Sequence, residues 1–129
     1  MARFFKHTRL LLLTSSLLLL FSCQEGKEAG DLLGQWRMND SDNHYISFSG
    51  SLTLFRNIGI SEVYGKFQRT GDSLFIQCYS IKGSRSDTIL VEDSFGFKPF
   101  TNIRVKIEKL DADRLELSKG SKRWSLMKY

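Results

Sequence analysis

The histidine, cysteine and acidic residues are the groups of this chain that could do acid–base or covalent chemistry. His44 is the single histidine after the N-terminal apolar run, and no cysteine or serine motif beside it indicates a nucleophile–base pair. Glu92 and Asp93 are consecutive in a segment that we expect to be extended, where neighbouring side chains point to opposite faces. They therefore do not form a glycosidase-like pair. No set of acid, base and nucleophile can be assembled, and we expect no enzymatic activity.

Metal and phosphate ligands are also sparse. Residues 39–43 read Asn-Asp-Ser-Asp-Asn and carry the oxygen ligands of a calcium loop, but they lack its glycine and its distal glutamate. Because the same residue types favour turns, a hairpin turn is the preferred interpretation. The sequence also contains no zinc-ligand spacing and no glycine-rich phosphate loop. We therefore predict no metal and no cofactor.

Cys23 ends the apolar run at the start of the chain. The first nine residues contain three basic side chains and no acid, and residues 10–21 are almost wholly apolar. A basic start followed by 7–15 apolar residues is typical of a secretory signal. The run has 12 residues, whereas a membrane-spanning helix needs about 20. Cleavage after Ser22 would place Leu20 where an ordinary signal peptidase site has a small residue.

The sequence Leu20-Phe21-Ser22-Cys23 resembles the lipobox of bacterial lipoproteins. The resemblance implies that residues 1–22 are a lipoprotein signal peptide and that Cys23 carries the lipid, with a diacylglycerol on its sulfur. Two or three acyl chains would anchor the protein in the membrane of a bacterial cell envelope. Gln24 in place of an aspartate favours the outer membrane, on its periplasmic or surface face. The alternatives are a transmembrane anchor, or an unlipidated cysteine at an ordinary cleavage site.

Processing at Cys23 changes the charge of the chain. The full sequence has a formal net charge of +5, but residues 1–22 contain three basic residues and no acid. The remaining 16 Lys and Arg against 14 Asp and Glu give +2, with both signs scattered. This balance does not indicate nucleic-acid binding, which needs a basic patch. Cys78 is left without an internal disulfide partner, and we expect it to be buried as a small apolar residue.

Period-two alternation of apolar and polar residues dominates from Leu32 onward. We therefore predict a tether over residues 23–31 and one domain over residues 32–129. The eight or nine short strands indicate an all-β fold, an antiparallel up-and-down meander that closes into an eight-stranded barrel. A β-sandwich is the alternative. The side chains that we expect to face inward include Phe48, Leu54, Phe67, Ile76, Val105 and Leu117.

The least regular part of the domain is residues 89–101, which contain the only proline and three phenylalanines. One interpretation is a long connection that packs Phe95, Phe97 and Phe100 onto the core. The other is a loop at the barrel mouth whose phenylalanines contact a ligand or partner, since binding residues favour loops on rigid scaffolds.

The opening Leu32-Leu33-Gly34-Gln35-Trp36 contains a Gly-x-Trp pair at the start of the meander. This opening, with closing strands at 114–117 and 122–126, resembles the lipocalin-like (calycin) domains, and in particular small lipocalin-like lipoproteins of Bacteroidetes. The resemblance implies that Gly34 lets the backbone pass closely under the barrel floor and that Trp36 plugs this floor.

In lipocalins a basic residue of the last strand covers this tryptophan. Arg123 is the obvious candidate, whereas side-chain alternation favours Lys122 or Lys128. The resemblance also implies non-catalytic binding of a small apolar ligand or a protein partner. The alternative is a structural or accessory lipoprotein whose barrel is filled by side chains and which docks onto an envelope complex.

Overall fold

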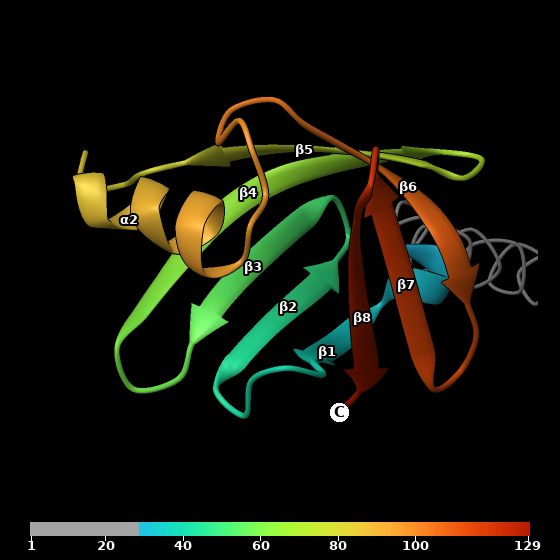
Figure 1. Cartoon of the computed structure of the whole chain (residues 1–129). Helices are drawn as coiled ribbons and strands as arrows, with labels where there is room; N and C mark the ends of the chain where they lie inside the picture. The colour runs from blue at the N-terminus through green and yellow to red at the C-terminus, as the bar shows by residue number, and fades with distance from the viewer. Residues whose placement is uncertain (1–28) are drawn as a thin grey trace, which may run out of the picture.

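The protein is described by a computed structural model that covers residues 29–129 (Figure 1). The signal peptide, the lipid-bearing Cys23 and most of the tether, all expected from the sequence, lie outside the described residues. No helix within residues 29–129 is long and apolar enough to cross a membrane. The elements in chain order are η1 (Gly30–Leu32), β1 (Gly34–Met38), β2 (His44–Ser49), β3 (Leu52–Asn57), β4 (Ser61–Thr70), β5 (Ser73–Tyr79), α2 (Arg85–Ile89), η2 (Leu90–Ser94), β6 (Ile103–Leu110), β7 (Arg114–Lys119) and β8 (Lys122–Lys128).

The eight strands form a closed antiparallel barrel. Each strand pairs with the next along the chain, and β1 closes the barrel by pairing with β8, where Arg37 lies opposite Met127. The predicted all-β, eight-stranded up-and-down barrel is confirmed, and the sandwich alternative does not apply. Within residues 29–129, every strand is therefore paired on both sides over at least part of its length.

The alternating strand directions give the barrel two distinct ends. One end, here called the entry end, holds the start of the domain at 29–33 and the turns at 50–51, 71–72 and 111–113. The opposite end, here called the far end, holds the turns at 39–43, 58–60 and 120–121 and the long connection at 80–102. In Figure 1 the first described residues and α2 accordingly lie on opposite sides of the barrel.

The inward faces of the strands form the core. Of the side chains expected to face inward, five are buried at 6% exposure or less, namely Phe48, Phe67, Ile76, Val105 and Leu117.

The prediction for Leu54 is wrong, because Leu54 is only half-buried while Thr53 and Phe55 point inward. The strand register gives the reason. Thr53 lies opposite Phe48 and Phe55 lies opposite Ile46, and directly opposed residues share a face.

The folded domain begins before the predicted boundary at residue 32. Ala29 is fully buried and its carbonyl accepts a hydrogen bond of 2.7 Å from the Leu32 amide. The 3-10 turn η1 then leads directly into β1. Residues 29–31, which the sequence assigned to the tether, therefore belong to the floor of the barrel.

Candidate functional site

Trp36 is fully buried at the floor of the barrel. Its indole Nε1 donates a hydrogen bond of 2.9 Å to the carbonyl of Leu32, so the polar atom of the ring is satisfied. Gly34 has φ = +122°, and a Cβ at this position would overlap the Lys128 side chain. The surroundings of both residues indicate a structural role. Trp36 fills the floor of the barrel, and Gly34 leaves room for the Lys128 side chain that covers Trp36.

The basic residue over Trp36 is Lys128. Its Nζ lies 4.6 Å from the Trp36 ring centroid and donates a hydrogen bond to the carbonyl of Leu33. An ammonium group over an indole face at this distance is a cation–π contact. Arg123 lies at an exposed position of β8. The alternation of inward and outward side chains along β8 therefore predicted the residue that covers Trp36, and Arg123 is not that residue.

The connection between β5 and β6 is partly helical. Residues 84–101, here called the strap, begin with Ser84, whose side chain accepts a hydrogen bond from the Ser86 amide at the start of α2. The expectation of an extended segment around Glu92 and Asp93 is wrong, because both lie in the π-helical turn η2. Ser84 with an acidic residue three positions later is the sequence signal that could have located this helix.

The strap carries two phenylalanines into the far end of the barrel. Phe95 and Phe97 are 2% and 1% exposed. The Phe97 ring stacks on Trp124 with centroids 4.3 Å apart, and Phe95 packs edge-on against Phe55 at 5.3 Å. Phe100 is half-buried against the same core. All three phenylalanines thus lie where the packing interpretation places them.

Polar contacts hold the strap in this position. Trp124 Nε1 donates a hydrogen bond of 2.8 Å to the carbonyl of Phe95, and Lys122 Nζ donates one of 2.9 Å to the carbonyl of Gly96. Glu92 Oε2 accepts a hydrogen bond of 2.8 Å from the Phe100 amide within the strap itself. Trp124 therefore holds the strap over the far end through two contacts: its ring stacks on Phe97, and its N–H group bonds to the carbonyl of Phe95.

The barrel interior is filled by its own side chains. The largest fully buried residues, Trp36, Phe48, Phe55, Phe67 and Phe97, belong to one contiguous cluster that continues from the floor to the strap. Buried aromatic side chains each take up a large volume, and protein cores pack to the density of organic crystals. Within residues 29–129, these side chains therefore occupy the centre of the barrel.

Cys78 lies on the inward face of β5 and has a free thiol. Burial raises its pKa to about 12, which disfavours the thiolate. His44 is at the start of β2, where its ring lies 4.8 Å from that of Phe95. Cys78 is therefore a buried thiol whose thiolate form is disfavoured, and His44 is an imidazole that packs against the Phe95 ring.

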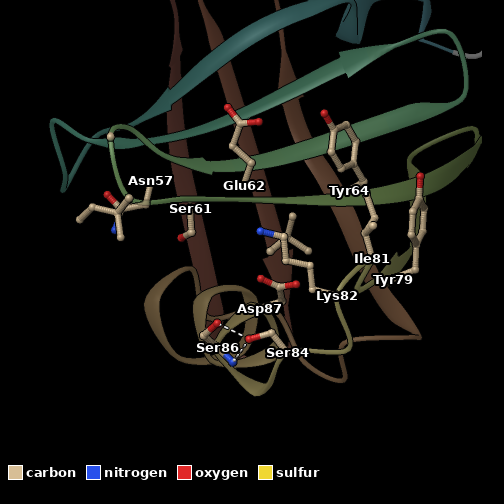
Figure 2. A pocket seen from close by; sticks show the side chains of 13 residues that line it. Asn57, Ser61, Glu62, Tyr64, Tyr79, Ile81, Lys82, Ser84, Ser86 and Asp87 are labelled. Carbon is tan, nitrogen blue, oxygen red and sulfur yellow. Dashed lines mark hydrogen bonds between the residues drawn. The ribbon is translucent and has the colours of Figure 1, made fainter.

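A hollow of about 590 Å³ lies outside the barrel at the far end. This far-end groove runs between β4 and the start of the strap, and Figure 2 shows the side chains around it. Its walls include Ile60, Glu62, Tyr64, Tyr79, Ile81, Lys82 and Asp87. The groove was not predicted from the sequence, because its walls are brought together by the pairing of β4 with β5 and by the turn of the chain after Tyr79.

The charged groups of the far-end groove are mostly engaged within the protein. Arg56 Nε lies 3.1 Å from a Glu62 carboxylate oxygen, and Asp87 Oδ2 accepts a hydrogen bond of 2.5 Å from Ser80 Oγ. Lys82 makes no ion pair with any residue in 29–129. No group of three potential metal ligands occurs within the same described part of the chain. The groove therefore presents the half-exposed rings of Tyr64 and Tyr79 beside carboxylates that already bond within the protein. Such a surface is suited to binding another molecule.

The fold and the floor geometry agree with comparisons to known proteins. A family model described as a lipocalin-like domain matches residues 17–129. The chain belongs to the lipocalin-like domain family. This confirms the resemblance noted at Gly34 and Trp36, and the barrel of this family indicates ligand binding.

Two solved structures resemble this lipocalin-like domain. A lipocalin-like protein from Bacteroides uniformis is 18% identical with a TM-score of 0.65, and the match covers 77% of this chain and 99% of that one. An uncharacterized protein from Bacteroides eggerthii is also 18% identical, with a TM-score of 0.60 and coverage of 75% and 98%. No curated protein matches the chain. At this identity the two structures support the fold alone.

Proposed function

We propose that this lipocalin-like domain is a non-catalytic, lipid-anchored protein of a bacterial envelope that binds a protein partner through its far end. The observation that carries the proposal is the filled barrel, in which Phe95 and Phe97 close the far end at 2% and 1% exposure. A barrel whose centre is occupied by its own side chains leaves its outer surface for recognition. Exposed Ile58, Ile60 and Ile81 gather at the far end, where apolar surface is available to a partner.

The proposed lipid on Cys23 would orient the domain. Cys23 precedes Ala29, the first described residue, by six positions, which span at most about 20 Å. Ala29 lies at the entry end, so an anchor at Cys23 would hold the entry end close to the bilayer. The far end would then face away from the membrane, toward other envelope proteins.

Replacement of Cys23 tests the anchor. In its own host, Cys23→Ser should move the full chain from the membrane fraction to the soluble fraction, because the thioether to the lipid cannot form. Ser22→Ala, which keeps a small residue before Cys23, is the matched control and should stay with the membranes. Membrane association of Cys23→Ser would mean that the apolar run itself is the anchor.

Site-specific photocrosslinking in cells tests the partner. Ile58 at the far end and Leu52 at the entry end are both 45% exposed, so the same crosslinker at either position samples solvent equally. We expect a discrete protein adduct from Ile58 and none from Leu52. Equal adducts from both positions, or an adduct from Leu52 alone, would contradict binding at the far end.

A small apolar ligand inside the barrel is the second candidate function. It is favoured by the origin of Phe95 and Phe97, which enter the interior from the strap and not from a strand. Displacement of the strap would free apolar space without breaking the barrel. Native mass spectrometry of the full chain, purified from its host in detergent, should then show a bound small molecule. Repeated detection of the ligand-free mass alone would exclude this candidate.

A further inference from the structure

β4 extends beyond the strand that pairs with it. It runs from Ser61 to Thr70, but its pairing with β5 ends where Tyr64 lies opposite Tyr79. Over residues 61–63 the strand therefore has β3 on one side and the far-end groove on the other. This short stretch of β4 therefore has no strand of residues 29–129 on its groove side.

The strand register shows which backbone groups face the groove. Gly71 and Asp72 form a two-residue turn, which makes Thr70 and Ser73 a hydrogen-bonded pair. Hydrogen-bonded pairs then recur at every second residue of β4, up to Tyr64 opposite Tyr79. By the same alternation, Glu62 directs its N–H and C=O toward the groove.

A hydrogen bond on the opposite side of β4 supports this alternation. The Phe67 amide donates a hydrogen bond of 2.9 Å to the carbonyl of Ser51, on the β3 side of the strand. Odd-numbered residues of β4 therefore bond toward β3 and even-numbered ones toward β5. Since β5 has ended, the backbone of Glu62 meets the groove and not a strand.

The chain itself turns away from this edge. After Tyr79 the Gly83 amide donates a hydrogen bond of 3.3 Å to the carbonyl of Ser80, and the Ser84 amide donates one of 2.9 Å to Ser80 Oγ. These contacts lead the chain into α2, which forms the opposite wall of the groove (Figure 2). The path that a longer β5 would follow is left open.

We propose that the far-end groove binds an extended polypeptide segment of the partner, which pairs with the backbone of Glu62 as an added strand. The inference rests on the proposed function and names the chemistry of the partner. An unpaired N–H and C=O on a strand are complementary to another strand and to few other ligands. The segment continues the line of β5 between β4 and α2.

The walls of the groove define the side chains of this segment. Ile60 and Ile81 are 77% and 73% exposed, and Tyr64 and Tyr79 lie side by side at 37% and 40%. They favour apolar side chains on the segment. Lys82 is the lining charge without an ion-pair partner in residues 29–129, which favours one acidic side chain nearby.

Selection of random nine-residue peptides displayed on phage against the full chain in detergent tests the proposal. Peptides selected on the wild type are then measured on Glu62→Pro and on Glu62→Ala. Both variants lose the Arg56 ion pair, but only proline removes the N–H that faces the groove. Because that N–H does not bond to β3, the ladder between β3 and β4 stays intact.

We expect the selected peptides to carry apolar residues and an acid, and to bind Glu62→Pro about tenfold more weakly than Glu62→Ala. No enrichment on the wild type, equal binding to the two variants, or occupation of the edge by a second copy of this chain would overturn the inference. If Glu62→Pro fails to fold, amide exchange at Glu62 in the wild type decides. A selected peptide should slow this exchange, and an unchanged rate overturns the inference.

The two proposals fail in distinguishable ways. A far-end adduct from the Ile58 crosslinker, combined with equal peptide binding to Glu62→Pro and Glu62→Ala, would leave the proposed function standing and remove the added strand. Absence of the adduct would remove the proposed function itself.

Discussion

Trp36 is held in place by a small set of neighbours at the scale of single residues. The Leu32 carbonyl accepts its N–H, and the Lys128 ammonium covers its ring at 4.6 Å. Gly34 is required because a side chain there would occupy the space of Lys128. Gly34 and Trp36 therefore act together to close the entry end of the barrel. This explains why the two residues lie at the start of β1.

Truncation of Trp36 should strongly destabilise the barrel. Trp36→Ala removes a fully buried ring and leaves a cavity, and we expect a loss of about 3–5 kcal/mol in the free energy of unfolding. Denaturant unfolding of the full chain in detergent measures this loss. Lys128→Met, which keeps the length of the side chain and removes its charge, should cost only about 0.5–1 kcal/mol. A loss below about 1 kcal/mol for Trp36→Ala would contradict the assignment of Trp36 as the floor plug.

Cys78 should resist thiol reagents while the protein is folded. Burial raises the pKa of Cys78 to about 12, so the thiol stays protonated at pH 8, and the side chain is also shielded from solvent. Alkylation by iodoacetamide, followed by mass spectrometry, should modify Cys78 only after denaturation. Rapid modification of the folded protein would mean that the barrel opens at β5 and exposes Cys78.

At the scale of elements, alternation predicted the strands well where each strand has apolar residues of one parity. Ile103, Val105 and Ile107 alternate with charged residues, and all three are buried as expected. The segment Leu52-Thr53-Leu54-Phe55 has apolar residues of both parities, so its own pattern does not decide which face is buried. Pairing with β2 makes that decision, and pairing is a tertiary property.

The strap and the far-end groove were less accessible to sequence reasoning. The helical part of the strap is short, and Phe95, Phe97 and Phe100 are compatible with either packing or binding. Their burial depends on the space left at the far end by β3 and β8. The groove depends on the different lengths of β4 and β5, which periodicity alone does not determine to one residue.

The turn between β6 and β7 should respond to acid. Asp111 Oδ1 accepts hydrogen bonds of 2.9 Å from the Asp113 amide and 2.8 Å from the Arg114 amide, and these bonds lower the pKa of the Asp111 carboxyl. A carboxyl whose pKa is lowered by folding stabilises the fold above its ordinary pKa of 3.8, and the contribution is lost as the pH falls through the lowered value.

Asp111→Asn tests this contribution, because the amide can accept the same bonds but does not titrate. The wild type should unfold at a higher denaturant concentration than the variant at neutral pH. The difference should shrink once the pH lies below the lowered pKa of Asp111. A difference between the Asp111 variant and the wild type that is independent of pH would contradict the assignment.

At the scale of the whole molecule, the filled barrel separates the two candidate functions. The core is continuous from Trp36 at the floor to Phe97 under the strap, so an interior ligand would have to displace protein side chains. In the proposed function the lipocalin-like barrel serves as a scaffold, and the open edge of β4 and the exposed isoleucines lie on its outside. Binding at the far end requires no opening of the core.

Truncation of Phe97 should convert the filled barrel into one with an interior cavity. Phe97→Ala removes a ring that stacks on Trp124 at 4.3 Å, and an apolar cavity of that size stays dry and accepts small aromatic molecules. We expect benzene to raise the melting temperature of Phe97→Ala and to leave that of the wild type unchanged. Phe75→Ala is the control, since the Phe75 ring lies under Arg104 on the outer face of the barrel. Stabilisation of the wild type by benzene would show that the native barrel already admits an apolar ligand, and the interior candidate would then replace binding at the far end.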